Sequence, residues 1–285
     1  EQGLATLITD AMAIDVEDQK LGLNGWSDLV DLIKSPKERL KIAVVGKYVD
    51  LHDSYMSVKE ALIHAGLFHS RDIEIDWIGA EDVENDGAAH YLSNVDGIVV
   101  PGGFGYRGVE GMIDTVKFAR ENNVPYLGLC LGMQVMVIEA ARNLLGKEGA
   151  NSSEFDSDTK DPVIDLMLDQ VDVKEKGGTM RLGVYPCVIE DGSIISRAYG
   201  TKNIMERHRH RFEFNNAYKE DLKSVGLLPT GISPDGQLVE IVEYKSHPFM
   251  AGTQFHPEFL SRPTRPHPLF REFIAAAGGV EPNSR

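Results

Sequence analysis

The chain has 285 residues, of which 42% are hydrophobic, and 44 acidic residues outnumber 29 lysines and arginines to give a net charge of −15. A chain of this size buries a large core, and no apolar run approaches the roughly 18 residues of a membrane span. We therefore expect a globular, cytoplasmic protein that binds neither nucleic acid nor membrane, because its negative charge repels both. Its two cysteines, Cys130 and Cys187, are expected to be reduced.

The first 40 residues carry short helical patterns with little core of their own. We expect them to precede the main domain, with a boundary at Ser35 and Pro36. A buried strand (41–49) and a helix (54–66) follow, which together form the start of a βα unit.

The next elements continue the alternation of strand and helix. Residues 73–80 alternate like a strand, and we expect an acidic loop at 80–88 behind it. A second buried strand (95–103) leads directly into the glycine-rich loop 101–108 (PGGFGYRG). This loop lacks the Lys-Ser/Thr ending of a P-loop and the Gly-x-Gly-x-x-Gly pattern, so it is not expected to bind nucleotide phosphates in the usual manner.

A strand, a sharp turn and a long helix follow between residues 124 and 145. The apolar run 124–127 predicts a buried strand, Gly-x-Cys-x-Gly predicts a tight turn at 128–132, and an apolar helical pattern begins at Met133. This is the outline of a nucleophile elbow, in which the turn raises one side chain above the sheet. That side chain is Cys130, and the helix end behind it is expected to lower the pKa of the thiol.

These elements predict an α/β fold: an open, mostly parallel sheet with helices on both faces. Ligands of such sheets bind at the carboxyl ends of the strands, where the turns at Gly102 and Cys130 lie. After Gly146 the pattern changes and predicts a small antiparallel region. We expect a polar loop at 150–162, a helix or strand at 163–173, short antiparallel strands with Gly turns at 177–196, and a last helix at 268–278.

A cysteine nucleophile needs a base, and the base needs an orienting carboxylate. Three histidines precede proline, His247, His256 and His267, but only His256 is followed two residues later by a carboxylate, Glu258. Proline favours an extended conformation before it, which would place His256 and Glu258 on one side of the chain.

Two further features bear on this site. Backbone N–H groups of Gly102, Gly103 and Leu131 are candidates for an oxyanion hole. His208 and His210 are spaced like a pair of metal ligands, but they lie in a run with three arginines that repel a cation, so we expect no metal.

Three motifs, PGGFG, GLCLGMQ and QFHPEF, resemble the class I glutamine amidotransferases, whose triad is Cys, His and Glu in that order. Six blocks in the same order, among them GGTMRLG and ERHRHRFEFN, resemble the C-terminal glutaminase half of the CTP synthase family. The resemblance implies a flavodoxin-like amidotransferase domain at 41–278 and a flexible tail at 279–285. Residues 1–40 resemble the linker and the end of a synthetase half whose body is absent.

The resemblance also assigns roles to individual residues. It implies that Cys130 attacks the side-chain amide of L-glutamine, that His256 protonates the departing ammonia and activates water, and that Glu258 orients His256. It further implies oxyanion N–H groups at Gly103 and Leu131, glutamine contacts from those two residues and from Gln134, Glu154 and Arg211, and a mobile lid that responds to GTP at Phe104, Tyr106 and Arg107.

The implied partners belong to the family's other half. Ammonia would pass to ATP-activated UTP to make CTP, a ligase reaction of pyrimidine nucleotide biosynthesis, with ATP, Mg and UTP bound in the synthetase half and GTP as activator. No cofactor is expected in this chain, and the full-length enzyme is expected to be a homo-oligomer. Two alternatives stay open: another thiol hydrolase of the same fold that acts on γ-glutamyl compounds, and a catalytically silent interaction module.

Overall fold

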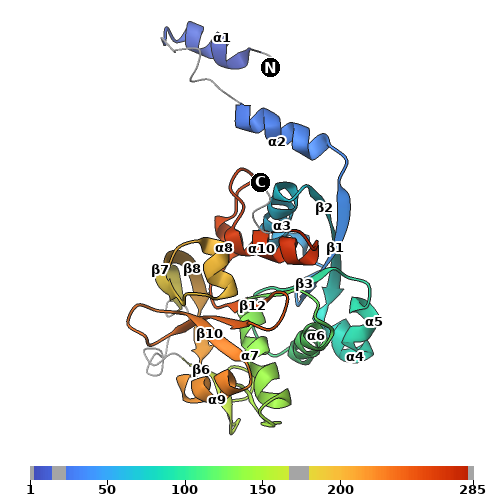
Figure 1. Cartoon of the computed structure of the whole chain (residues 1–285), viewed down its shortest axis with the longest axis vertical. Helices are drawn as coiled ribbons and strands as arrows, with labels where there is room; N and C mark the ends of the chain where they lie inside the picture. The colour runs from blue at the N-terminus through green and yellow to red at the C-terminus, as the bar shows by residue number, and fades with distance from the viewer. Residues whose placement is uncertain (1–2, 15–23, 167–179, 282–285) are drawn as a thin grey trace. The chain divides into compact units, whose positions relative to one another are not determined.

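The computed structural model describes residues 3–14, 24–166 and 180–281 (Figure 1). The chain divides into two compact units, Glu1–Lys37 and Glu38–Arg285. The first unit holds two helices, α1 (Leu4–Ala11) and α2 (Asn24–Lys34). No helix among the described residues is both long and apolar enough to cross a membrane.

The second unit is built on a sheet of nine strands in the order β2-β1-β3-β4-β12-β11-β10-β7-β8. The first five strands in this order run parallel to one another, and each of the remaining four is antiparallel to its neighbour. The strands are β1 (Glu38–Gly46), β2 (Arg71–Gly79), β3 (Gly97–Val100), β4 (Tyr126–Leu129), β7 (Arg181–Ile189), β8 (Asn203–His210), β10 (Leu227–Ile232), β11 (Val239–Tyr244) and β12 (Met250–Thr253).

A small second sheet contains three strands, β5 (Asn151–Ser152), β6 (Pro162–Leu166) and β9 (Phe212–Phe214). The predicted α/β class with an antiparallel region is therefore confirmed. Residues 163–166, for which both helix and strand were open, belong to strand β6, and residues 167–179 lie outside the described residues.

Helices cover both faces of the large sheet (Figure 1). Side chains alternate along β1, so that Ile42 and Val44 pack into one core while Ala43 and Val45 pack into the other. The first core is closed by α3 (Met56–Phe68), α8 (Ile194–Tyr199) and α10 (Pro268–Ala277). The second is closed by α4 (Ala80–Asp86), α5 (Ala88–Leu92), α6 (Val109–Asn122), α7 (Leu131–Asn143) and α9 (Lys219–Ser224).

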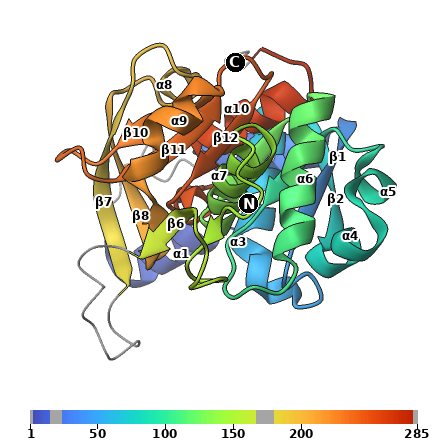
Figure 2. The ribbon, with the colours of Figure 1, turned by 90° about the horizontal axis from the view of Figure 1, so that it is seen from below.

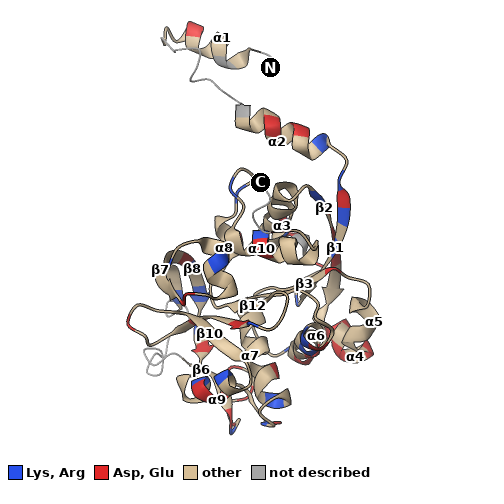
Figure 3. Cartoon of the chain, in the orientation of Figure 1, with Lys and Arg blue, Asp and Glu red and all other residues tan. Residues whose placement is uncertain are grey.

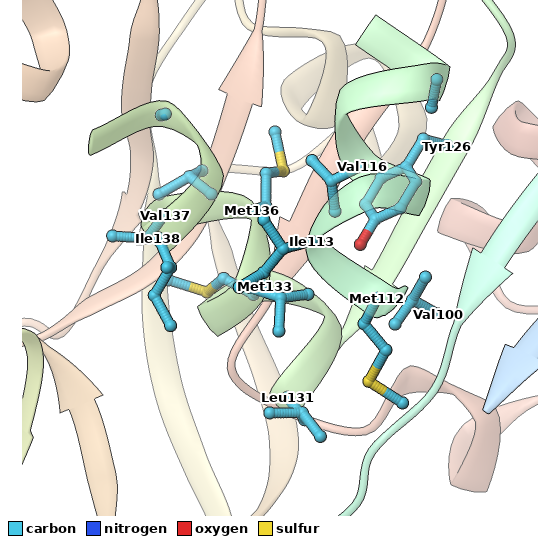
Figure 4. Close-up of a cluster of buried hydrophobic side chains, with 14 of the residues drawn as sticks. Val100, Met112, Ile113, Val116, Tyr126, Leu131, Met133, Met136, Val137 and Ile138 are labelled. Atoms are coloured by element: carbon cyan, nitrogen blue, oxygen red, sulfur yellow. The ribbon is translucent and has the colours of Figure 1, made fainter. Parts of the chain in front are cut away.

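Helix α7, which follows Cys130, is the most deeply enclosed helix of this core. Figure 2 shows α6 between α7 and α4, and Figure 4 shows Met112 of α6 together with Met133 and Met136 of α7 in one apolar cluster. Glu139 of α7 has no solvent exposure, and its charge is paired with Arg120 at 2.7 Å (Nη2 to Oε1). Close packing on all sides therefore holds the start of α7 in place.

Three local predictions were wrong. The acidic segment 80–88 was expected to be a loop but contains α4, because Ala80 and Val83 are buried and two acidic residues in its first turn suit a helix N-terminus (Figure 3). Residues 194–196 were expected to be strand but begin α8, whose first turn is capped by Ser193. Helix α7 begins at Leu131, two residues before the expected start.

Candidate active site

Cys130 lies at the sharp turn between β4 and α7. Its φ of 53° and ψ of −99° are an uncommon conformation for a residue with a side chain, and its N–H donates to the carbonyl of Thr253 at 2.6 Å. The flanking glycines provide clearance: a Cβ on Gly132 would lie 2.1 Å from the carbonyl oxygen of Val100, and one on Gly128 would lie 2.6 Å from Gly132. The positive φ therefore falls on the cysteine itself, and the glycines permit close packing around it.

Cys130, His256 and Glu258 lie together at the carboxyl ends of the adjacent parallel strands β4 and β12. A Cβ placed on Gly102 would meet both His256 (Cε1 at 2.9 Å) and Cys130 (Cβ at 3.6 Å). Glu258 Oε1 is 2.8 Å from His256 Nδ1, so the carboxylate fixes the tautomer that has its hydrogen on Nδ1. Nε2 of His256 is buried and has no hydrogen-bond partner among the described residues, which leaves it available to a bound molecule or the thiol.

The surroundings of His256 favour its charged form. Burial alone lowers the pKa of the imidazole, but Cys130 first and Glu258 second outweigh that effect and raise the pKa to about 10. The ring of Phe259 stacks on the imidazole, with centroids 5.4 Å apart and an interplanar angle of 26°. An imidazolium beside Cys130 is the charge that stabilises a thiolate.

The backbone that joins His256 to Glu258 differs from the expected extended conformation. His256 is the N-cap of the 3₁₀ helix η5 (Pro257–Leu260), and Glu258 lies within that helix. Proline in the first turn supplies the fixed φ with which such a helix begins. The two side chains still meet, but a turn brings them together.

One pocket of about 410 Å³ gathers most of the residues that the resemblance assigned to glutamine. They come from the loop after β3, helix α7, the loop after β5 and the residue that follows β8. The N–H groups of Gly103 and Leu131 donate to no other group in the described part of the chain. The pocket is lined by Gly103, Phe104, Cys130, Gln134, Ser153, Glu154, Met180, Arg209, His210, Arg211 and Phe212.

A second pocket, of about 310 Å³, also reaches the triad. Cys130, His256 and Glu258 line it together with Tyr48 and Phe259. Cys130 is therefore accessible from two sides, although its own exposed fraction is only 6%.

The loop 101–108 is attached to the domain at several points. The N–H of Gly105 donates to Glu154 Oε1 at 3.0 Å, and Lys47 Nζ donates to the carbonyls of Phe104 (3.4 Å) and Gly105. Arg107 donates to Glu81 at 2.5 Å and to the carbonyl of Lys47 at 2.9 Å. Burial lowers the pKa of Lys47 to about 8.

Of the three predicted lid residues, only Phe104 lines the two pockets. Tyr106 is 79% exposed and lines neither of them. Lys47, which holds this loop, was not singled out in the sequence. Its only local signal was its position directly after a buried strand.

His208 and His210 point inward from β8 toward Glu240 of β11, and their potential ligand atoms lie within 4.8 Å of one another. His210 Nδ1 donates to the carbonyl of Phe212 at 3.0 Å, which leaves Nε2 of the neutral ring as an acceptor for His208 Nδ1 at 3.1 Å. Burial lowers the pKa of His208 to about 2 and that of His210 to about 3. Arg181 is ion-paired with Glu240 Oε1, whereas His208 Nε2 and Glu240 Oε2 are buried and have no hydrogen-bond partner among the described residues.

Two further residues are Gln254, which the sequence analysis did not single out, and Cys187, which lines neither pocket. Gln254 immediately follows β12, is fully buried and contacts the thiol of Cys130. In the sequence, the only signal for this role was that Gln254 lies two residues before His256. Cys187 is buried, which raises the pKa of its thiol, and both cysteines are free.

Comparison with known proteins places this site in a family. The family described as glutamine amidotransferase class-I matches residues 50–276. A CTP synthase from Dehalococcoides mccartyi is 58% identical over 279 residues, which are 98% of this chain and 51% of that protein. A CTP synthase from Roseiflexus sp. is 56% identical over 278 residues, 97% of this chain and 50% of that protein.

A solved structure agrees with these matches. The glutaminase domain of Trypanosoma brucei CTPS with bound acivicin is 39% identical and has a TM-score of 0.80, and the match covers 85% of this chain and 95% of that one. The chain spans about half the length of the curated relatives it matches. It belongs to the class I glutamine amidotransferase family.

Proposed function

We propose that this chain is the glutaminase part of a glutamine-hydrolysing CTP synthase and that Cys130, His256 and Glu258 are its catalytic residues. The observation that carries this proposal is the arrangement of the three side chains: a strained cysteine at a helix N-terminus, a histidine with a free Nε2 beside it, and a carboxylate on Nδ1. This arrangement matches the roles of nucleophile, general acid and base, and orienting group.

In the proposed reaction, the Cys130 thiolate attacks the side-chain carbonyl carbon of glutamine. The N–H groups of Gly103 and Leu131 stabilise the oxyanion. His256, protonated at Nε2, gives its proton to the leaving nitrogen, so that the C–N bond breaks, ammonia departs and a thioester with Cys130 remains. His256 then removes a proton from water, the hydroxide attacks the thioester, and glutamate and the Cys130 thiolate are released.

Recognition of free glutamine is assigned to the 410 Å³ pocket. Glu154 would bind the α-ammonium group, Arg211 the α-carboxylate, and Gln134 the bound substrate. The N–H of Gly105 already binds Glu154, which links the substrate pocket to the predicted lid of Phe104, Tyr106 and Arg107. The His208 and His210 pair is proposed to have no metal, because Arg181 binds Glu240 there.

The transfer of ammonia would involve a synthetase half, which supplies the sites for ATP, Mg and UTP, with GTP as activator. The length of the relatives supports this extension. So does the exposed face of β7 and β8, where Leu182, Val184 and Met205 are 53% to 64% exposed. Apolar side chains grouped on one sheet face are typical of a surface that a partner covers.

The proposal is tested with a glutamine-like electrophile and with glutamine itself. Cys130→Ala should lose both covalent labelling and glutamate release. Cys187→Ala removes a buried thiol that lines neither pocket; it is the matched control and should keep both activities. Normal turnover in Cys130→Ala would disprove the mechanism. Faster turnover of γ-glutamyl peptides than of glutamine would favour another hydrolase, and absence of labelling in the unchanged chain would favour a silent module.

A coupled assay tests the wider role. The chain alone should form no CTP from UTP, ATP and glutamine, because no Gly-x-x-x-x-Gly-Lys-Ser/Thr phosphate cradle occurs in the sequence. Addition of a synthetase half in trans should raise glutaminase activity. CTP formed by the chain alone would contradict the assignment of the synthetase chemistry to the other half.

A further inference from the structure

Gln254 contacts Cys130 and Gln134, which both line the glutamine pocket, and it has no role in the mechanism above. It follows β12 directly, its side chain is fully buried, and its backbone N–H donates to the carbonyl of Glu240 at 2.8 Å. Its side-chain amide has two polar contacts: Nε2 is 3.6 Å from Cys130 Sγ, and Oε1 is 3.3 Å from Gln134 Nε2. The amide therefore joins the sulfur to a residue that lines the pocket.

The direction of this amide follows from a neighbouring carbonyl. Gln134 has one side-chain atom 3.1 Å from the carbonyl oxygen of Phe212, and because a carbonyl only accepts, that atom is the nitrogen. The same nitrogen also faces Gln254, which must present its oxygen there. The NH₂ group of Gln254 is consequently directed at Cys130, and the opposite orientation would oppose two donors at one end of the amide.

We propose that Gln254 is a positioning residue for Cys130, donating an N–H···S hydrogen bond that favours the thiolate and holds the sulfur between the two pockets. This inference rests on the proposed role of Cys130 as nucleophile. A hydrogen bond to the charged form of an acid stabilises that form, and the Gln254 donor is enclosed where water does not compete. Through Gln134, which lines the substrate pocket, the same chain of hydrogen bonds connects the sulfur of Cys130 to a residue that would contact the bound substrate.

Other polar groups also lie around Cys130, and all of them remain when Gln254 is replaced. The carbonyl of Arg209 is 4.0 Å from Sγ, on the side of β8. Besides Cys130, the titratable and charged residues that surround the two pockets are Tyr48, Tyr55, Glu154, Arg209, His210, Arg211, His256 and Glu258, with Lys47 behind the loop 101–108. A variant at Gln254 therefore isolates one neutral donor.

The test is the pH dependence of alkylation of Cys130 by iodoacetamide, followed by mass spectrometry of the Cys130 peptide. Gln254→Leu should raise the midpoint of the alkylation curve by about one pH unit, which is the effect of losing a hydrogen bond to a charged group. Gln254→Glu, which preserves the shape, should raise it further because a carboxylate faces the thiolate. In Gln254→Leu, kcat for glutamine should fall about tenfold with a smaller change in KM.

Gln237→Leu, at an exposed glutamine, is the matched control and should leave both curves unchanged. Thermal denaturation reports whether each variant is folded, and Gln254→Glu carries the test if Gln254→Leu unfolds. Unchanged midpoints in the folded Gln254 variants, with normal alkylation of the unchanged chain, would overturn this inference alone. Normal glutamine turnover in Cys130→Ala would instead overturn the proposed function.

Discussion

A methyl group at Gly102 should separate the nucleophile from its base. A Cβ there would lie 2.9 Å from Cε1 of His256, whereas ordinary contacts of a Cβ begin at 3.4 Å. The imidazole must therefore move away by about half an ångström. It is held by the 2.8 Å contact with Glu258 and by the stacked ring of Phe259, so the movement weakens either that contact or the approach to Cys130.

The expected result for Gly102→Ala is a loss of about 10- to 100-fold in kcat/KM, since a misplacement approaching 1 Å costs about 100-fold in an aligned site. Stability should change little, because the clash is with a side chain at the rim of a pocket and the φ of Gly102 is an ordinary one. The same variant should label more slowly with a glutamine-like electrophile, since the base is displaced.

The assay compares glutamate release, electrophile labelling and the thermal midpoint of Gly102→Ala with those of Gly149→Ala. A Cβ on Gly149 meets no atom within 4 Å, so this control should behave like the unchanged chain. If Gly102→Ala folds and keeps kcat/KM within threefold of the unchanged chain, His256 does not act from the position that it has in this structure.

Three further predictions concern stability, substrate affinity and pH. Gly132→Ala should destabilise the fold by several kcal/mol, because its Cβ would lie 2.1 Å from the carbonyl oxygen of Val100, and a urea titration with an unchanged midpoint would contradict this. Glu154→Gln and Arg211→Met should each raise KM for glutamine by about 30-fold, the equivalent of about 2 kcal/mol for an unpaired substrate charge, and less than threefold in both would refute their assignment. Burial lowers the pKa of Lys47 from 10.5 to about 8, so between these two pH values the unfolded chain binds one proton more than the folded chain. The free energy of unfolding should therefore rise with pH in this range by about 3 kcal/mol at most, relative to Lys47→Met. Urea titrations at several pH values that give the same pH dependence of this free energy for both proteins would contradict the prediction.

The elements whose signals are local were predictable from the sequence. The apolar strand, the Gly-x-Cys-x-Gly turn and the helix after it follow one another directly, and the structure places Cys130 at that turn. The proximity of His256 to Glu258 was also local, although the helix η5 rather than an extended chain produces it. The alternation of strands with helices was enough to predict the α/β class, because it reflects which faces must be buried.

Strand order and burial decided the rest. β12 pairs with β4, which brings His256 to Cys130, and no local pattern states which strands will be neighbours. Residues 80–86 form helix α4, against which α6 packs closely: a Cβ on Gly111 would lie 1.9 Å from the carbonyl oxygen of Ala80. Lys47 and Gln254 are ordinary polar residues in the sequence and acquire their contacts only when the fold removes water from around them. A buried polar group must find its partners within the protein, and the choice of those partners depends on the packing of the whole chain.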